Sequence, residues 1–171
     1  MNNDVTDEID FNNDYMMLVD AGLSFNSPYP LVLHGERKVD IIISFDWSDR
    51  GEDTYWPFEE LEKAEQWAKE RRVPFPDLTT RLQEIKEDWE KGIYEEVYIF
   101  RGQSAPTIVH FVMINKSFRR VEDASSDFDI LPEYKTLRFG YSEKEFLKFS
   151  KLVRHNVIQN RNFFILFSGE G

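Results

Sequence analysis

The sequence contains no cysteine, which excludes a disulfide framework and any zinc site built from thiolates. It is also poor in positive charge, because 21 lysine and arginine residues stand against 32 aspartate and glutamate residues, for a net charge of -11. No basic stripe offsets the repulsion that such a chain meets at a nucleic-acid phosphate backbone. Simple electrostatic adsorption to anionic lipid is disfavoured for the same reason.

Long apolar runs are absent as well. The longest, Phe163 to Phe167, has five residues, whereas a membrane-crossing helix needs about 20. Residues 1–14 are polar and acidic, unlike a secretory signal, so we expect a flexible leader there. Residues 15–171 have the length of one domain with a substantial core, and we expect a cytoplasmic protein without a transmembrane segment.

What is abundant is aromatic residues, at 15% of the chain. Short runs rich in β-branched and aromatic residues predict strands at Tyr15 to Val19, Val39 to Phe45, Val97 to Phe100 and Thr107 to Ile114. Gly102 to Pro106 joins the last two runs as a turn, so we expect these two strands to pair antiparallel. The three consecutive isoleucines of Val39 to Phe45 suggest burial on both faces, in the middle of a sheet covered by helices.

Helical patterns alternate with these strands. Phe58, Leu61, Ala64 and Ala68 form one stripe, which is more typical of a core than of a ligand site. Asp77 can cap a second helix, whose apolar residues at helical spacing are Leu78, Leu82, Ile85 and Trp89 and which ends at Gly92. The sequence Ser142-x-x-Glu145 is a capping box that opens a third, amphipathic helix.

Asp20 is the main candidate for chemistry. It directly follows the predicted strand Tyr15 to Val19, and Gly22 allows a tight turn two residues later. Reacting groups of α/β proteins commonly lie at the carboxyl ends of core strands. Asp-x-Gly is also a common turn sequence. The alternative interpretation is therefore that Asp20 only stabilises its own turn through hydrogen bonds to the nearby backbone.

Other polar residues leave similar alternatives open. Ser44 to Ser48 follows a strand, where it is either turn chemistry or support for Asp20. His110 lies within a strand pattern and is interpreted as a core or sheet-face histidine. Asp123, Asp127 and Asp129 lack the spacing of a helix-loop-helix calcium site, which favours a solvated loop.

Four ordered blocks resemble the cytosolic phospholipase A2 family (group IV). They are Val19-Asp20-Ala21-Gly22-Leu23-Ser24-Phe25-Asn26-Ser27-Pro28-Tyr29-Pro30-Leu31-Val32-Leu33, Val39 to Ser48, Pro57 to Leu61 with Trp67-Ala68, and Ala105 to Val112. The likeness extends more weakly to about Asn160, and the last ten residues depart from the family. It implies an α/β fold, namely the carboxyl-terminal part of a three-layer, patatin-like catalytic domain with a mixed sheet.

By this resemblance, Asp20 matches the aspartate of a Ser-Asp dyad that hydrolyses acyl esters of glycerophospholipids, as in phospholipase A2 and lysophospholipase enzymes of lipid degradation. The serine motif Gly-x-Ser-x-Gly is absent, since Gly102-Gln103-Ser104-Ala105 lacks the second glycine. The calcium-binding membrane module of many relatives is absent too, so we expect no cofactor in this chain. Arg37 matches a family arginine, but its simpler interpretation is a surface salt bridge, so it is left out of the site.

The sequence therefore predicts half of a hydrolase site, with Asp20 as its one catalytic residue. The substrate implied by the resemblance is a glycerophospholipid at a membrane surface, with peripheral membrane association of the full-length form. The rival hypothesis is a catalytically inactive fragment that acts as an interaction or regulatory module. Without the rest of the sheet, the isolated chain should expose apolar surface and self-associate.

Overall fold

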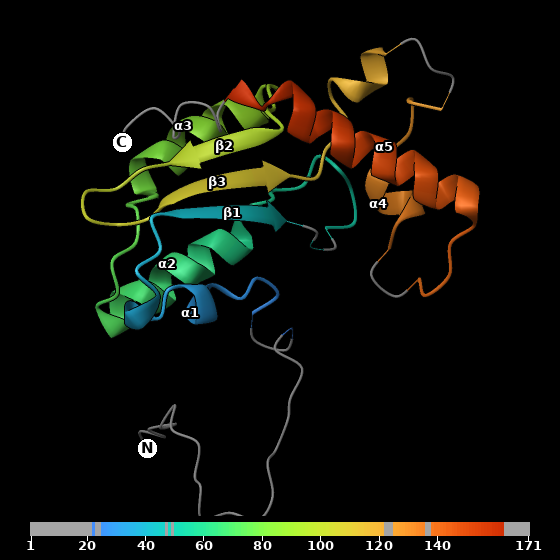
Figure 1. Ribbon diagram of the computed structural model, residues 1–171. Helices are drawn as coiled ribbons and strands as arrows, with labels where there is room; N and C mark the ends of the chain where they lie inside the picture. Colours follow the sequence, from blue (N-terminus) through green and yellow to red (C-terminus); the bar gives the residue numbers. More distant parts are fainter. Residues whose placement is uncertain are drawn as a thin grey trace, which may run out of the picture.

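The computed structural model describes residues 22, 25–46, 48, 50–121, 125–135 and 138–162, and every structural statement below concerns those residues. The described strands form a three-stranded sheet, and helices lie around it (Figure 1). The strands are β1 (Ile41–Asp46), β2 (Val97–Phe100) and β3 (Thr107–Val112). The helices are α1 (Tyr29–Val32), η2 (Gly35–Arg37), α2 (Glu59–Arg71), α3 (Thr79–Glu90), η3 (Phe118–Arg120), α4 (Ile130–Glu133) and α5 (Glu143–Gln159).

The sheet is mixed, as predicted, and has the order β1-β3-β2. β1 runs parallel to β3, and β2 runs antiparallel to β3, which confirms the predicted antiparallel pair. The predicted strand Tyr15 to Val19 and the predicted leader at residues 1–14 lie outside the described residues.

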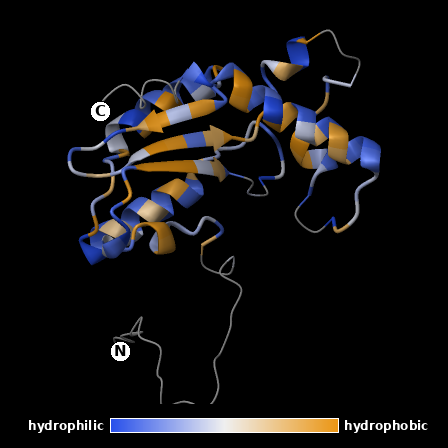
Figure 2. Cartoon of the chain, viewed as in Figure 1, coloured by the Kyte–Doolittle hydropathy of each residue, from blue (hydrophilic) through white to orange (hydrophobic). Residues whose placement is uncertain are grey.

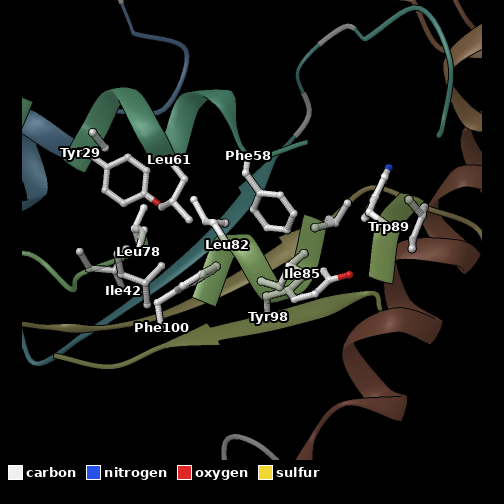
Figure 3. Close-up of a cluster of buried hydrophobic side chains, with 14 of the residues drawn as sticks. Tyr29, Ile42, Phe58, Leu61, Leu78, Leu82, Ile85, Trp89, Tyr98 and Phe100 are labelled. Carbon is white, nitrogen blue, oxygen red and sulfur yellow. The ribbon is translucent and has the colours of Figure 1, made fainter. Parts of the chain in front are cut away.

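One face of the sheet, the inner face, packs against α2 and α3 (Figure 3). The predicted helical stripes supply this core, because Leu61 and Ala64 of α2 meet Leu82, Ile85 and Trp89 of α3 across Phe58. The capping prediction was wrong by one residue, because Leu78 is the N-cap of α3; Asp77 Oδ1 accepts a hydrogen bond from Thr79 N at 3.0 Å in the turn before the helix. Sequence periodicity therefore located both helices correctly.

The other face of β1 shows where the prediction for Val39 to Phe45 was wrong. Ile42 is buried, but Ile41 is 39% exposed and Ile43 is 50% exposed, so the strand is buried on one face only. Among the described strands β3 lies between β1 and β2, and the predicted neighbour of β1, Tyr15 to Val19, lies outside the described residues. The physical reason is coverage: α2 and α3 lie over the inner face, and no described helix covers the outer face of β1.

Helix α5 begins as the sequence predicts. Ser142 Oγ accepts a hydrogen bond from Glu145 N, and the Glu145 carboxylate accepts one from Ser142 N at 2.7 Å, which completes the capping box. The helix is amphipathic (Figure 2). Its apolar face meets the outer face of the sheet at Val157. It also helps to form a second small core of Met113, Phe118, Phe128, Ile130 and Leu152.

Replacing Ser142 with alanine should lower the free energy of unfolding by about 1 kcal/mol, because the amide of Glu145 then loses its side-chain acceptor. Urea unfolding measured by circular dichroism checks the value. Ser150→Ala, at an exposed site within the same helix, is the matched control and should not destabilise the protein. Equal losses in the two variants would show that the cap contributes nothing.

Candidate functional site

Asp20, the predicted catalytic residue, lies outside the described residues, so the structure does not locate its carboxylate. The chain that follows it is well anchored. Asn26 N donates to Glu60 Oε2 of α2 at 2.9 Å, and Tyr29 at the start of α1 is 2% exposed. Figure 3 shows Tyr29 among the core side chains beneath α2. Asn26 and Tyr29 are therefore fixed against α2 and the inner face of the sheet.

Tyr29 reaches the main polar feature of the core, which we call the buried polar cluster and define as Tyr29, Ser44, Asp46 and His110. Ser44 and His110 are register partners on the parallel strands β1 and β3, and Ser44 Oγ lies 3.2 Å from His110 Nδ1. Two residues later on the same face of β1, Asp46 is 2% exposed, and its Oδ1 accepts a hydrogen bond from Ser48 N at 2.9 Å. Alternation along β1 thus brings two polar side chains into the core.

Burial dominates the electrostatics of this cluster. Desolvation lowers the pKa of His110 to about 4, although the negative charge of the Asp46 carboxylate acts to raise it. The Pro57 backbone favours the charged ring only weakly, since His110 Nε2 has no partner at hydrogen-bond geometry. Burial likewise raises the pKa of the Tyr29 hydroxyl to about 12, and the nearby Ser44 hydroxyl opposes this without a well-formed hydrogen bond. Both groups are neutral at pH 7.

Arg50 adds a partly buried positive charge beside Asp46. Its Nη2 donates to the carbonyl oxygen of Met113 at 2.9 Å, while Nε and Nη1 have no hydrogen-bond partner. Desolvation lowers the pKa of Arg50, and the Asp46 and Asp53 carboxylates oppose that shift. Asp53 itself is engaged, because its oxygens accept hydrogen bonds from Ile130 N and Leu131 N at the start of α4. The cation therefore lies between the end of β1 and α4.

The buried polar cluster is not a catalytic triad, although it contains Ser, His and Asp. A triad needs the serine on one ring nitrogen of the histidine and the carboxylate on the other. Here Nδ1 faces Ser44, and Nε2 has no carboxylate partner. All three side chains are less than a tenth exposed, so a substrate ester has no access.

A second Ser-His pair lies where the start of η3 meets α5. Ser117 Oγ lies 2.8 Å from His155 Nε2 and also 2.8 Å from Glu96 Oε1. The carboxylate therefore contacts the serine instead of orienting the histidine, and Ser117 N donates to the same carboxylate at 2.7 Å. This arrangement ties α5 to the start of β2 and provides no activated nucleophile.

The remaining described sequence candidates are exposed side chains. Ser104 lies in the predicted turn between β2 and β3 with φ +56°, and Arg37 is exposed in η2 without an ion pair among the described residues. Asp127 and Asp129 both pair with Arg119, at 3.3 and 2.6 Å, and are well exposed, as expected of a solvated loop. Asp123 lies outside the described residues.

Two kinds of feature are absent from the described ranges. Three or more histidine or acidic side chains do not converge there as metal ligands. No described helix combines the length and apolarity that crossing a bilayer requires.

Sequence reasoning found part of the polar cluster and missed the rest. It flagged Ser44 to Ser48 as a turn or as support for Asp20, and it interpreted His110 as a core residue, which the structure confirms. It missed Tyr29 within the cluster and Arg50 beside it. Their roles depend on contacts with distant strands and loops, and no local motif signals either one.

No protein-family model matches the chain. The similar curated protein and the similar solved structures, however, are all cytosolic phospholipase A2 proteins. The chain is 34% identical over 162 residues to mouse cytosolic phospholipase A2 zeta, a match that covers 86% of this chain and 18% of that protein. Its fold matches human GIVD cytosolic phospholipase A2 bound to methyl gamma-linolenyl fluorophosphonate and terbium chloride, with TM-score 0.67 and 25% identity, covering 87% of this chain and 22% of that one.

A second human GIVD structure gives TM-score 0.68 at 24% identity, over 86% of this chain and 20% of that chain, and thus supports the fold. The chain spans about a fifth of the length of each of these relatives. The α/β fold expected from the sequence is therefore that of a cytosolic phospholipase A2 catalytic domain. As a segment of about a fifth of a member's length, this chain is similar to the cytosolic phospholipase A2 family.

Proposed function

We propose that this chain contributes to acyl-ester hydrolysis of glycerophospholipids, as part of a phospholipase A2 or lysophospholipase site. The 34% identity to mouse cytosolic phospholipase A2 zeta over most of the chain carries this proposal. The fold match to the human enzyme bound to a linolenyl fluorophosphonate inhibitor supports it, since that ligand carries a fatty chain. The substrate would be met at a membrane surface by a cytoplasmic protein that associates peripherally.

In this proposal Asp20 is the general base. A serine hydroxyl must lose its proton as it attacks an ester carbonyl, and a carboxylate within hydrogen-bond reach can accept it. The serine comes from outside this sequence, because the chain has no Gly-x-Ser-x-Gly motif. The anchored segment from Asn26 to Tyr29 supports this role, since it follows Asp20 closely and holds that part of the chain against α2.

The same missing motif favours a second candidate function. A chain with a phospholipase fold but no nucleophile of its own can serve as an interaction or regulatory module. The two described Ser-His pairs do not supply the missing nucleophile. Hydrolysis in the presence of the rest of the domain separates the two candidates.

A chimera tests the proposal directly. The 162-residue matching segment of mouse cytosolic phospholipase A2 zeta is replaced by this chain, and hydrolysis of phosphatidylcholine vesicles is followed by release of fatty acid. Asp20→Asn should lower the rate by about 10²–10⁴-fold, the range for loss of a general base. Asp40→Asn, at an exposed position just before β1, is the matched control and should leave the rate unchanged.

The isolated chain should show no turnover under the same conditions, because an aspartate cannot activate a serine that is absent. A chimera that folds but does not hydrolyse vesicles supports the non-catalytic module instead. Turnover by the isolated chain that Asp20→Asn abolishes would mean that a serine of this sequence is the nucleophile.

A further inference from the structure

One exposed side of α5 carries positive charge on an otherwise acidic chain. Its side chains recur at alternating intervals of three and four residues, which places them in one stripe along the helix. We call this stripe the basic face of α5 and define it as Lys144, Leu147, Lys151, Arg154 and Ile158. The three cations are exposed, and Leu147 and Ile158 are 50% and 40% exposed. The stripe lies opposite Leu152, through which the helix packs into the second small core.

The charge of this face comes from a local absence of acidic residues. The chain has 32 aspartate and glutamate residues, yet none lies between positions 146 and 169, a stretch that contains Lys148, Lys151, Arg154 and Arg161. Lys148 is neutralised by Glu133 at 2.8 Å, whereas Lys144 and Arg154 form no ion pair among the described residues. Glu143 is the one acidic side chain among the described residues that line the two shallow hollows along this face.

The net charge of -11 does not decide how this face behaves. At physiological ionic strength, charges in water are screened over about 8 Å. Helix α5 meets the outer face of the sheet at Val157, whereas the acid-rich helices α2 and α3 lie over the inner face. The first turns of α5 also extend past the ends of the strands (Figure 1). The objection to adsorption on anionic lipid, which used the charge of the whole chain, therefore does not extend to this face.

The composition of the basic face fits an anionic membrane better than a helix of another protein. A helical partner packs against an apolar seam at this spacing, but three of the five positions here are charged. Helices that lie in the membrane interface combine cations, which meet lipid phosphates, with apolar side chains that enter the acyl region. Lysine and arginine suit such a position, because their methylene stems stay in the apolar layer while their charged ends reach the headgroups.

We propose that the basic face of α5 binds the anionic surface of a membrane. Lys144, Lys151 and Arg154 contact lipid phosphates, and Leu147 and Ile158 insert between the lipids. The inference rests on the proposed function, since a phospholipid substrate is met at a membrane surface. It goes further by naming the side of this chain that turns toward the lipid and by assigning it a preference for negatively charged lipid.

Binding of the 171-residue chain to vesicles tests this proposal. Sedimentation compares vesicles of phosphatidylcholine alone with vesicles that contain about a third phosphatidylserine, to which the chain should bind more tightly. Each cation near an anionic leaflet strengthens binding by about fivefold, so joint replacement of Lys144, Lys151 and Arg154 with glutamine should weaken binding to the mixed vesicles by about 100-fold. Salt at about 1 M, where screening shortens to about 3 Å, should weaken binding of the unmodified chain.

Three exposed cations on the opposite side of the sheet give a matched control. They are Arg81 and Lys86 of α3 and Lys91 directly after it. Their joint replacement with glutamine changes the net charge from -11 to -14, as the three substitutions on α5 do. This variant should bind the mixed vesicles as tightly as the unmodified chain. Circular dichroism checks that both variants fold, and the lipid and salt comparisons on the unmodified chain need neither of them.

A fluorescent probe locates the contact. Because the chain has no cysteine, a single introduced thiol can carry an environment-sensitive dye. On Leu147→Cys the dye should shift its emission to shorter wavelength with the mixed vesicles, since it enters the acyl region. On Lys86→Cys, exposed on α3, it should not shift.

Four outcomes would overturn the proposal. Equal binding to the two kinds of vesicle removes the preference for anionic lipid, and equal losses in the α5 and α3 variants remove the basic face as its source. A dye on Leu147→Cys that shifts without vesicles as the chain is concentrated identifies a second copy on this face. A shift without vesicles that disappears when residues 1–21 or 163–171 are deleted identifies that segment instead.

Failure of this inference can be told from failure of the proposed function, because binding is measured without hydrolysis. Charge-dependent binding through α5, together with a mouse chimera that does not hydrolyse vesicles, supports the inference and counts against the proposed function. Hydrolysis by the chimera, together with binding that the α5 substitutions leave unchanged, does the reverse.

Discussion

Truncating Phe58 to alanine should lower the free energy of unfolding by about 3–5 kcal/mol, the largest effect expected from a single substitution in this chain. Phe58 is fully buried between α2 and the sheet, at the centre of the side chains in Figure 3. Its ring lies 4.7 to 6.2 Å, between centroids, from the rings of Trp56, Trp89, Tyr98, Phe100 and His110. Truncation removes the ring and leaves a cavity that rigid aromatic neighbours fill poorly.

Urea unfolding followed by tryptophan fluorescence measures this loss. Since domains of this size are stable by about 5–15 kcal/mol, the variant should unfold at a much lower urea concentration. Tyr55→Ala removes a comparable ring from a half-exposed position and should cost less than about 1 kcal/mol. A loss below about 1 kcal/mol for Phe58→Ala would contradict the central place given to this residue.

Acidification should destabilise the protein through His110. The unfolded state binds a proton near pH 6.5, whereas desolvation holds the pKa of the folded histidine at about 4. Between these values the unfolded state binds more protons, so stability falls as the pH falls through this window. The expected loss is about 2 kcal/mol between pH 7 and pH 5, and about 3 kcal/mol once the pH reaches 4.

The groups around His110 are the neutral Ser44 and Tyr29, the Asp46 carboxylate and the Arg50 cation. Unfolding by urea at several pH values between 7 and 5 should therefore give a smaller pH dependence for His110→Asn than for the parent chain. His34→Gln, at an exposed histidine, should keep the full dependence. An unchanged dependence in His110→Asn would assign the acid sensitivity to another group.

The sequence was sufficient for the elements whose signals are local. Capping at Ser142 and Glu145, and the apolar spacing from Leu78 to Trp89, depend on residues within one or two turns of each other. The pairing of Val97 to Phe100 with Thr107 to Val112 depends on a short turn. All three predictions held because backbone geometry and side-chain pattern agree within a few residues.

The features that sequence did not reveal depend on distant contacts. Three isoleucines in a row look the same whether one face or two are covered, so the exposure of Ile43 required knowledge of where α2 and α5 lie. Likewise, Tyr29 and Arg50 join the polar region beside β1 through the path of the chain between elements. The predicted role of Asp20 came from resemblance, and it stays a prediction.

The parallel pairing of β1 with β3 has a consequence for how the chain acquires its structure. Partners in this pair, such as Ser44 and His110, are 66 positions apart, and the intervening chain includes α2, α3 and β2. Bringing such distant residues together costs loop-closure entropy before any contact repays it, whereas the β2–β3 hairpin closes locally. Folding should therefore start from the hairpin and the two helices, and β1 should join last. The strand that follows the Asp20 segment is then the final part of the sheet to be secured.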